Sequence, residues 1–210
     1  MIDLYTWGTP NGRKVSIMLE ELGLKYNTHS VDITKGQQHE PAFLKVSPNN
    51  RIPAIVDSDG PGGKPISVFE SGAILIYLAE KTKSGLLPAD PRKRTETLQW
   101  LMWQMGGVGP MFGQAHHFMY KPKEDVPYGK KRYHDETKRL YKVMNGRLGE
   151  AKYLAGNDYN IADIATYPWV QRYNRHEVDL NEFPNVKRWF DAMSKRPAVE
   201  NGMQVPFYND

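Results

Sequence analysis

Two stretches of sequence decide the fold: residues 49–55, which read NNRIPAI, and residues 69–74, which read FESGAI. Pro53 enters a run of β-forming residues, and it marks a sheet edge or a loop end because proline cannot donate to a strand ladder. Taken alone, a structural turn proline is the commoner interpretation. Glu70 and Ser71 open a helix, where both residue types are ordinary at a cap. The two stretches in this order are far more specific than either one alone.

The second stretch also suits a charged ligand. A helix N-terminus binds a carboxylate through its backbone N–H groups, here with the Ser71 hydroxyl beside them. Glu70 would accept a hydrogen bond from an adjacent ammonium group. A carboxylate and an ammonium on one carbon form an α-amino acid head, such as the γ-glutamyl end of glutathione. We therefore expect Glu70 and Ser71 to bind such a head, with plain helix capping as the alternative.

Strand and helix signals alternate in the first part of the chain. A strand at 2–7 is broken by Gly8, and Thr9 followed by Pro10 suits an N-cap and a first helical turn. Periodicity and turn residues then predict further strands and helices. The strands are 26–31, 52–57 and 66–69, and the helices are 10–22, 41–46 and 70–81. This order is that of a small α/β unit.

The strand signal ends after Leu86-Leu87-Pro88, and only helical patterns follow. They cover 91–118, where three glycines and Pro110 interrupt the pattern, and then 127–149, 160–173 and 185–195. Strands and helices followed by helices alone predict two domains. We place an α/β domain at 1–82 and an all-α domain at 90–210. In the second domain Asn160 and Asp163 have the spacing of an N-terminal capping box, which is structural in function.

The chain has 210 residues and no cysteine, so a disulfide framework, a thiolate metal site and a cysteine nucleophile are all excluded. Any thiol chemistry must come from a ligand. The net charge of +4 is spread along the chain, and no nucleic-acid motif is visible. The sequence has no apolar run of the roughly eighteen residues that a membrane helix needs, and the N-terminus lacks a basic secretory region. A cytoplasmic location is the resulting prediction.

The motifs in this order resemble the glutathione transferase superfamily over nearly the whole chain. Residues 9–14 (TPNGRK), 47–53 (SPNNRIP) and 109–114 (GPMFGQ), followed by His116 and His117, are similar to the nu class. That class includes bacterial disulfide-bond oxidoreductases and is close to the glutathione-binding domain of the yeast nitrogen-regulating prion protein. The resemblance implies a thioredoxin-like, glutathione-binding domain at 1–82. It also implies a helical domain with a second-substrate pocket and part of a homodimer interface.

Two positions compete for the thiol of glutathione. Many family members use a tyrosine late in the first strand, where Tyr5 lies, and others use a group at the start of the first helix. In the nu-class pattern the residue at Tyr5 belongs to the core, so we favour Thr9 and Asn11 as the catalytic residues. Their donors and the helix N-terminus would lower the pKa of a bound thiol. Thr9 can cap the helix at the same time.

The resemblance assigns further glutathione-binding residues. Gln38, in the loop after the second strand, could hold the glycyl carboxylate. The proline that matches Pro53 is cis in thioredoxin-like folds, and Ile52 before it should pair with the cysteinyl backbone. Arg51 adds positive charge beside it. Arg132 matches a nu-class arginine that reaches a ligand carboxylate, although without the resemblance it would count as a solvated arginine in a basic run.

Adjacent His116 and His117 invite a metal interpretation, but they point to different helix faces and no third ligand lies at useful spacing. We predict no metal. Apolar residues nearby are candidates for the second-substrate pocket, with core or dimer interface as the alternative. They are Met111, Phe112, Phe118, Met119, Tyr120 and Trp169.

Together these features predict a glutathione-dependent disulfide-bond oxidoreductase that acts through the thiolate of bound glutathione, in its reduced or oxidised form. Its partners would be a small disulfide, peroxide or electrophile and a second copy of the chain, without nucleic acid or membrane. Transferase or peroxidase activity would be secondary. The alternatives are a plain detoxifying transferase and a non-catalytic glutathione-binding regulatory protein.

Overall fold

The computed structural model of the chain describes residues 1–120 and 122–206. The chain divides into two compact units, residues 1–84 with 196–206, and Gly85–Lys195. The first unit holds a four-stranded sheet with helices, and the second is helical, as the sequence predicts. Within the described segments, no helix is both long enough and apolar enough to span a bilayer.

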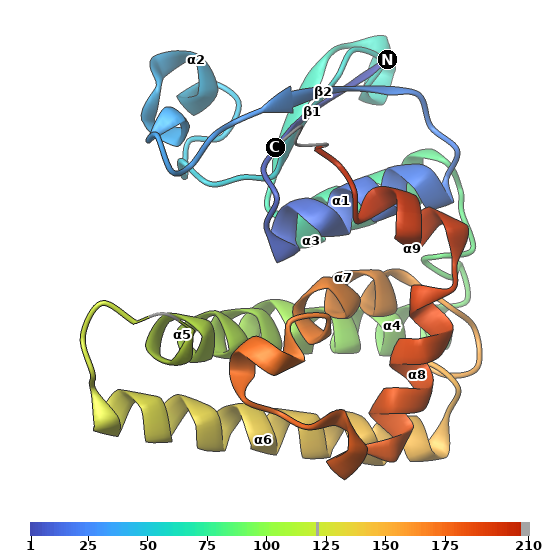
Figure 1. The fold of residues 1–210 in the computed structure, drawn as a ribbon. Coiled ribbons are helices and arrows are strands. Elements are labelled where there is room, and N and C mark those ends of the chain that lie inside the picture. The colour runs from blue at the N-terminus through green and yellow to red at the C-terminus, as the bar shows by residue number, and fades with distance from the viewer. Residues whose placement is uncertain (121, 207–210) are drawn as a thin grey trace. The chain divides into compact units, whose positions relative to one another are not determined.

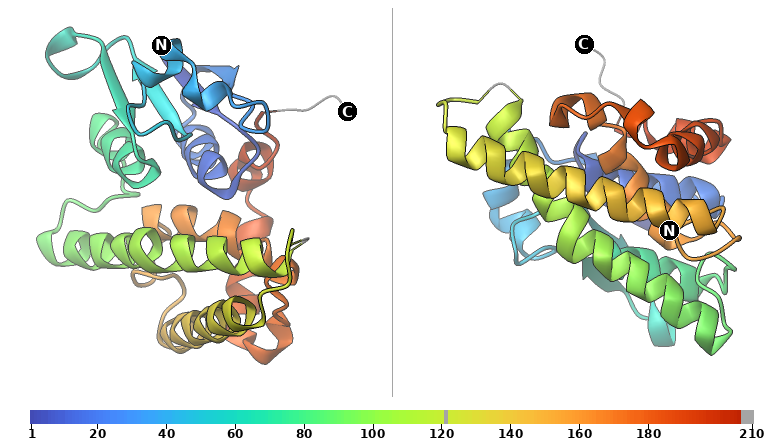
Figure 2. Two further views of the ribbon diagram at one scale, coloured as in Figure 1. Left: turned by 90° about the vertical axis from the view of Figure 1, so that its left-hand side faces the viewer. Right: turned by 90° about the horizontal axis from the view of Figure 1, so that it is seen from below.

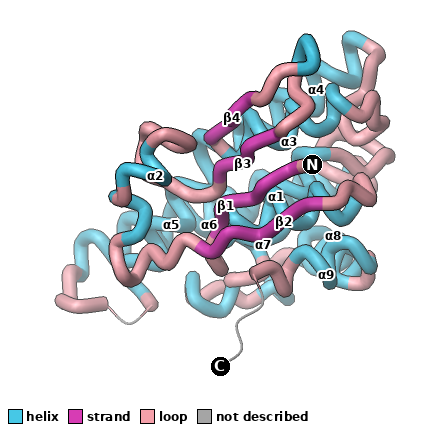
Figure 3. The backbone as a smooth tube through the Cα atoms, turned by 90° about the horizontal axis from the view of Figure 1, so that it is seen from above, coloured by secondary structure: helices cyan, strands magenta, loops and turns pink. Residues whose placement is uncertain are grey.

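The sheet of the first unit has the order β2-β1-β3-β4 (Figure 3). Its strands are β1 (Ile2–Thr6), β2 (Tyr26–Ser30), β3 (Ala54–Asp57) and β4 (Ile66–Phe69). Strand β1 is parallel to β2 and antiparallel to β3, and β3 is antiparallel to β4. Along β1 buried and half-buried residues alternate, so the strand presents one face fully to a core.

Helices cover the two faces of this sheet differently. The helices α1 (Pro10–Glu21) and α3 (Ser71–Lys81) lie side by side against one face (Figure 1) and bury an apolar core with Leu4 and Ile55. On the other face Phe43, from the short helix α2 (Pro41–Leu44), packs with Val31, Ala54 and Tyr5. The 3-10 turns Gln37–His39 and Pro61–Gly63 complete the connections.

A short helix near the C-terminus, α9 (Pro197–Gly202), belongs to the first unit and packs along α1 (Figures 1 and 2). A Cβ atom on Gly202 would lie 2.5 Å from the Ile17 backbone, so only glycine permits this approach. The Ser16 hydroxyl donates to the Gly202 carbonyl at 2.6 Å, and Arg196 forms a two-pronged ion pair with Glu21 at 2.8 and 2.9 Å.

This segment departs from the predicted helical domain at 90–210. Residues 196–206 group with the first unit, where α9 contacts α1, and 207–210 lie outside the described residues. Helix α9 has six residues, too few for hydrophobic periodicity to predict that it packs against α1.

The helical unit contains α4 (Pro91–Trp103), α5 (Gly109–Met119), α6 (Pro127–Glu150), α7 (Ile161–Val170) and α8 (Pro184–Ser194). Two 3-10 turns, Tyr173–His176 and Leu180–Glu182, lie between α7 and α8. Helices α4 and α5 are joined by a π-helical segment, Gln104–Val108, which contains Gly106 and Gly107 and directly precedes Gly109 and Pro110 of α5. Proline has no N–H to donate, and the wider π turn accommodates it without ending the helix. Helix α6 runs beside α5 (Figure 2).

The predicted capping box of α7 is confirmed, and it lies at a buried hub. The Asn160 side chain accepts from the Ala162 N–H at 3.0 Å, and Asp163 accepts from the Asn160 N–H at 3.2 Å. Asp163 also accepts from the Leu154 N–H at 3.0 Å and from the indole of Trp189 at 2.8 Å. Burial raises the pKa of Asp163 to about 6 despite these donors.

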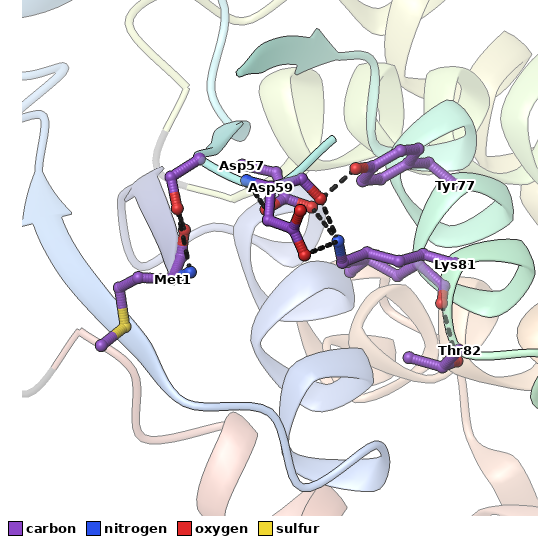
Figure 4. A network of polar contacts seen from close by, with 8 residues as sticks. Met1, Asp57, Asp59, Tyr77, Lys81 and Thr82 are labelled. Atoms are coloured by element: carbon purple, nitrogen blue, oxygen red, sulfur yellow. Dashed lines mark hydrogen bonds and ion pairs between the residues drawn. The ribbon is translucent and has the colours of Figure 1, made fainter. Parts of the chain in front are cut away.

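A second buried carboxylate ties α3 to the sheet (Figure 4). Asp57, at the end of β3, accepts from the Tyr77 hydroxyl at 2.6 Å and from the Asp59 N–H at 3.0 Å, and pairs with Lys81 at 3.0 Å. Burial alone would raise the pKa of Asp57, but these bonds outweigh it and hold the pKa below its usual value. The network fixes the last turn of α3, so the direction of its first turn is fixed as well.

Replacing Asp163 by alanine should lower the free energy of unfolding by about 3 kcal/mol or more, because several buried donors would lose their acceptor. Asn160→Ala should cost about 1 kcal/mol, the ordinary value of an N-cap. Urea unfolding of both variants measures the difference. Asp158→Ala is the matched control, since that carboxylate is exposed. An equal loss of unfolding free energy in Asp163→Ala and in the control would show that the hydrogen bonds of Asp163 do not stabilise the fold.

Candidate active site

The strand register brings the predicted site residues of the first unit to one end of the sheet. Tyr5, near the end of β1, pairs with Ala54, and Ala54 pairs with Phe69 at the end of β4. Thr6 likewise pairs with Ser30 at the end of β2. The segments that carry Thr9 and Asn11, Gln38, Arg51 and Ile52, and Glu70 and Ser71 therefore all leave or enter the sheet at this end.

The start of α1 is built around Thr9. Its Oγ1 accepts from the Gly12 N–H at 3.2 Å, which caps the helix. A threonine hydroxyl has two acceptor sites and one proton, so the cap uses a lone pair and does not use the proton. Pro10 occupies the first helical position, and Asn11 follows it at the helix start. A Cβ on Gly12 would lie 2.4 Å from the Trp7 carbonyl, so glycine is required for this tight turn.

The start of α3 has no side-chain cap. Glu70 stands at the N-cap with a φ of 70° and a ψ of 113°, a left-handed conformation that strains a residue other than glycine. The N–H groups of Gly72 and Ala73 donate to no acceptor in the described part of the chain. Asn49 holds the Glu70 carboxylate with an N–H···O bond of 3.3 Å. An uncapped helix start with a fixed carboxylate beside it is suited to a zwitterionic head group.

Behind this helix start lies Lys14, which the sequence did not reveal as a site residue. Its side chain is 1% exposed, and its ammonium donates to the Ser71 hydroxyl at 3.3 Å. Burial lowers the pKa of Lys14 to about 7, and the nearby charge of Glu70 opposes that shift. Lys14 lies one helical turn before the buried Met18, and this spacing is the signal that could have placed it on the inner face.

The peptide bond Ile52–Pro53 is cis, as the resemblance implies. Among the described residues, the N–H and C=O of Ile52 have no hydrogen-bonding partner. Neighbouring Arg51 is exposed and has its carbonyl held by Ser47 at 2.8 Å. The side-chain oxygen of Gln38 is buried and receives no donor from the described segments. Such open backbone and amide groups are those that a bound peptide would satisfy.

Tyr5, the competing thiol donor, lies on the other face of the sheet. Its ring stacks on His29 with centroids 4.7 Å apart and is tilted against Phe43 at 6.2 Å. It therefore belongs to the apolar layer under α2, while Thr9 begins the helix that covers the opposite face.

In the helical unit, a cleft of about 710 Å³ between α5 and α6 includes Arg132. Its neighbours are paired, Lys131 with Asp135 at 2.5 Å and Arg139 with Glu136 at 2.7 Å. Arg132 is exposed and forms no ion pair with any carboxylate of the described residues. The cleft is lined by Met111, Tyr128, Lys131, Arg132, Tyr133, Asp135, Glu136 and Arg139.

Of the six residues predicted for a second-substrate pocket or a core, three lie in the core. Met111 lines the cleft, but Phe112, Met119 and Trp169 are buried in the helical core, where Phe112 stacks on Tyr141 at 5.0 Å. Phe118 stacks on Tyr133 at 5.3 Å. An aromatic pattern alone does not distinguish a pocket from a core, because both bury apolar area.

His116 is half-buried, and burial together with the charges of Arg172 and Arg175 lowers its pKa. His176 is fully buried, and burial lowers its pKa to about 3. In the described part of the chain, no group of three or more His, Asp or Glu side chains could hold a metal ion.

Comparison with known proteins identifies the family. Residues 9–81 match the glutathione S-transferase N-terminal domain, and residues 108–197 match the glutathione S-transferase C-terminal domain. The chain belongs to the glutathione S-transferase family.

Three individual relatives are similar to the chain over nearly its whole length. The chain is 54% identical over 201 residues to the disulfide-bond oxidoreductase YfcG of Escherichia coli (strain K12), an alignment that covers 95% of this chain and 93% of that protein. A family member from Pseudomonas fluorescens, solved with two glutathione bound, superposes with a TM-score of 0.93 at 48% identity and covers 98% and 93% of the two chains. A glutathione transferase from Pseudomonas putida, solved with one glutathione disulfide per subunit, superposes with a TM-score of 0.93 at 46% identity. The superposition covers 98% of this chain and 91% of that chain.

Glu70→Ala and Ser71→Ala should each weaken glutathione binding by about 2–4 kcal/mol, because each leaves a charged ligand group without its partner. Isothermal titration with reduced glutathione measures the change. Glu80→Ala removes the same charge from the other end of α3 and should bind as the unaltered chain does. Unchanged affinity in both site variants would show that the ligand head binds elsewhere.

Proposed function

We propose that this protein is a glutathione-dependent disulfide-bond oxidoreductase. One observation carries the proposal: a chain without cysteine has, at one end of its sheet, an uncapped helix start, open peptide groups and a threonine hydroxyl. These are complementary to the head, backbone and sulfur of a thiol peptide. The relatives named above, which are a disulfide-bond oxidoreductase and transferases with bound glutathione or its disulfide, support the same function.

The parts of glutathione are assigned as follows. The start of α3, with Ser71, would hold the glutamyl carboxylate, and Glu70 would accept from the glutamyl ammonium. The N–H and C=O of Ile52 would pair with the cysteinyl residue as a short strand does. Gln38 would donate its amide to the glycyl carboxylate, and Arg51 would add positive charge at this end.

The thiol would then lie at the start of α1. Donors from Thr9 and Asn11, together with the helix N-terminus, favour the thiolate over the thiol and lower the thiol pKa. The thiolate attacks one sulfur of a substrate disulfide, forms a mixed disulfide with it and releases the other sulfur as a thiolate, which takes up a proton. A second glutathione resolves the mixed disulfide and yields oxidised glutathione and the second substrate thiol. No disulfide to the enzyme forms in these reaction steps, because the chain has no cysteine.

Arg132 would take a carboxylate of the second glutathione or of the substrate. Its exposed guanidinium, which is in no ion pair with the described carboxylates, and the cleft of about 710 Å³ around it support this role. Conjugation of electrophiles and reduction of peroxides would use the same thiolate. The cytoplasmic location stays a prediction from the sequence.

Thr9→Ala and Asn11→Ala should reduce turnover of a small model disulfide by about 10²–10³-fold and weaken glutathione binding much less, because their donors matter most for the charged sulfur. Steady-state rates and calorimetric titration of the same variants separate the two effects. Oxidised glutathione should bind at least as well as the reduced form.

Other results would select the alternatives. If oxidised glutathione does not bind and the disulfide is not turned over, while a chloronitrobenzene-type electrophile is conjugated rapidly, the protein is a plain transferase. Binding without turnover of any disulfide or electrophile would indicate a non-catalytic glutathione-binding protein.

We also propose a homodimer. Large apolar side chains are exposed on the helical unit, among them Met102 at 51% and Tyr128 at 76%, and Gly106 permits close backbone approach. Size-exclusion chromatography with light scattering should give twice the chain mass at micromolar concentration, and Met102→Lys should shift the equilibrium toward monomer. A fully active monomer at that concentration would refute the dimer.

A further inference from the structure

A buried ammonium group lies directly behind the proposed glutamyl site. Lys14 projects from the first half of α1, is 1% exposed, and donates to Ser71 Oγ at 3.3 Å across the α1–α3 contact. Burying a cation costs free energy, and an apolar side chain of similar volume is often as stable or more stable at such a place. The apolar packing of α1 against α3 would therefore accept an uncharged side chain of this size.

The geometry gives the lysine a function toward a ligand. Ser71 opens α3, where Gly72 and Ala73 leave N–H groups without acceptors among the described residues. A hydroxyl whose oxygen accepts from an ammonium is polarised and becomes a stronger donor through its proton. A carboxylate bound at this helix start would thus receive the backbone donors, the Ser71 proton and the positive charge behind it.

We propose that Lys14 is a positioning residue of the carboxylate end of the site, which orients the Ser71 hydroxyl and supplies buried positive charge to the glutamyl carboxylate of glutathione. This inference rests on the proposed glutathione-binding function and deepens it. Lys14 reaches the ligand through Ser71 and takes no part in the thiol chemistry.

The charge of Lys14 depends on pH in the neutral range. Burial lowers its pKa to about 7, and Glu70, which precedes α3, is the group whose charge opposes the shift. Other charged side chains on the elements packed around Lys14 are Arg13 on α1, Lys81 on α3, Glu200 on α9 and Asp57 on the sheet. Below pH 7 the ammonium is charged and strengthens carboxylate binding. As pH rises through 7 it loses its proton, so affinity should fall.

The test uses S-methylglutathione, which lacks a titrating thiol, and calorimetric titration between about pH 6 and about pH 8. The unaltered chain should lose about fivefold in affinity or more over this range. Lys14→Met should bind about fivefold or more weakly at the lower pH and show a nearly flat profile. Its melting temperature should be equal or higher, a combination that a merely structural lysine would not give. Lys25→Met, an exposed lysine after α1, is the control and should match the unaltered chain.

Two further measurements complete the test. In the Ser71→Ala background, Lys14→Met should cost less affinity than in the unaltered chain, because the lysine acts through the serine. Should Lys14→Met fail to fold, NMR titration of the Lys14 side chain in the unaltered protein decides: saturation with S-methylglutathione should raise its pKa.

An unchanged lysine pKa, or parallel pH profiles for the unaltered chain and Lys14→Met, would overturn the inference while glutathione binding stands. If the unaltered chain fails to bind S-methylglutathione at any pH, the glutathione site itself is refuted and the inference with it.

Discussion

The pairing of Tyr5 with Ala54, and of Ala54 with Phe69, is the constraint on which the rest of the site depends. These pairs fix where β1 and β4 end and where β3 begins, and so where the flanking segments turn. Because side chains alternate along a strand, a slip of one residue would expose Leu4 and move every turn away from its partners. The Asp57 network at the far end holds α3 to this register.

Helix starts in this chain are treated in two ways. At α1, α4 and α7 the side chains of Thr9, Asp90 and Asn160 accept from the first backbone N–H groups, at 3.2, 2.9 and 3.0 Å. Helix α3 has no such cap and begins with a left-handed Glu70. Side-chain caps are also absent at α2, α5, α6, α8 and α9, so the missing cap alone does not distinguish α3. What distinguishes it is the positive φ of Glu70 at its N-cap, a strained conformation expected where a ligand completes the structure.

Strands and helices of the first unit follow from local signals, and the structure places each within about two residues of the prediction. What the sequence hides are partners distant along the chain. Helix α9 is short, and its contact with Ile17 depends on Gly202, a single glycine that belongs to no recognisable sequence motif. Lysine is usually exposed, and only the spacing of Lys14 from Met18 indicates that it is buried. Phe112 and Trp169 fit a pocket and a core equally until their neighbours are known.

Thr9 and Ser71 share one arrangement. Each hydroxyl oxygen accepts from a donor of the protein, the Gly12 N–H for Thr9 and the Lys14 ammonium for Ser71. A hydroxyl has a single proton, and a donor on one lone pair restricts where that proton can point. In the proposed site both hydroxyls would donate to the ligand, an arrangement that would favour anionic groups. In the proposed binding mode, glutathione would offer one such group to each hydroxyl, the thiolate to Thr9 and the glutamyl carboxylate to Ser71. A chain without cysteine must bind its sulfur from outside. In the proposed site the Thr9 hydroxyl would favour the ionised thiol that reacts, and the Ser71 hydroxyl would favour the ionised carboxyl that anchors the ligand.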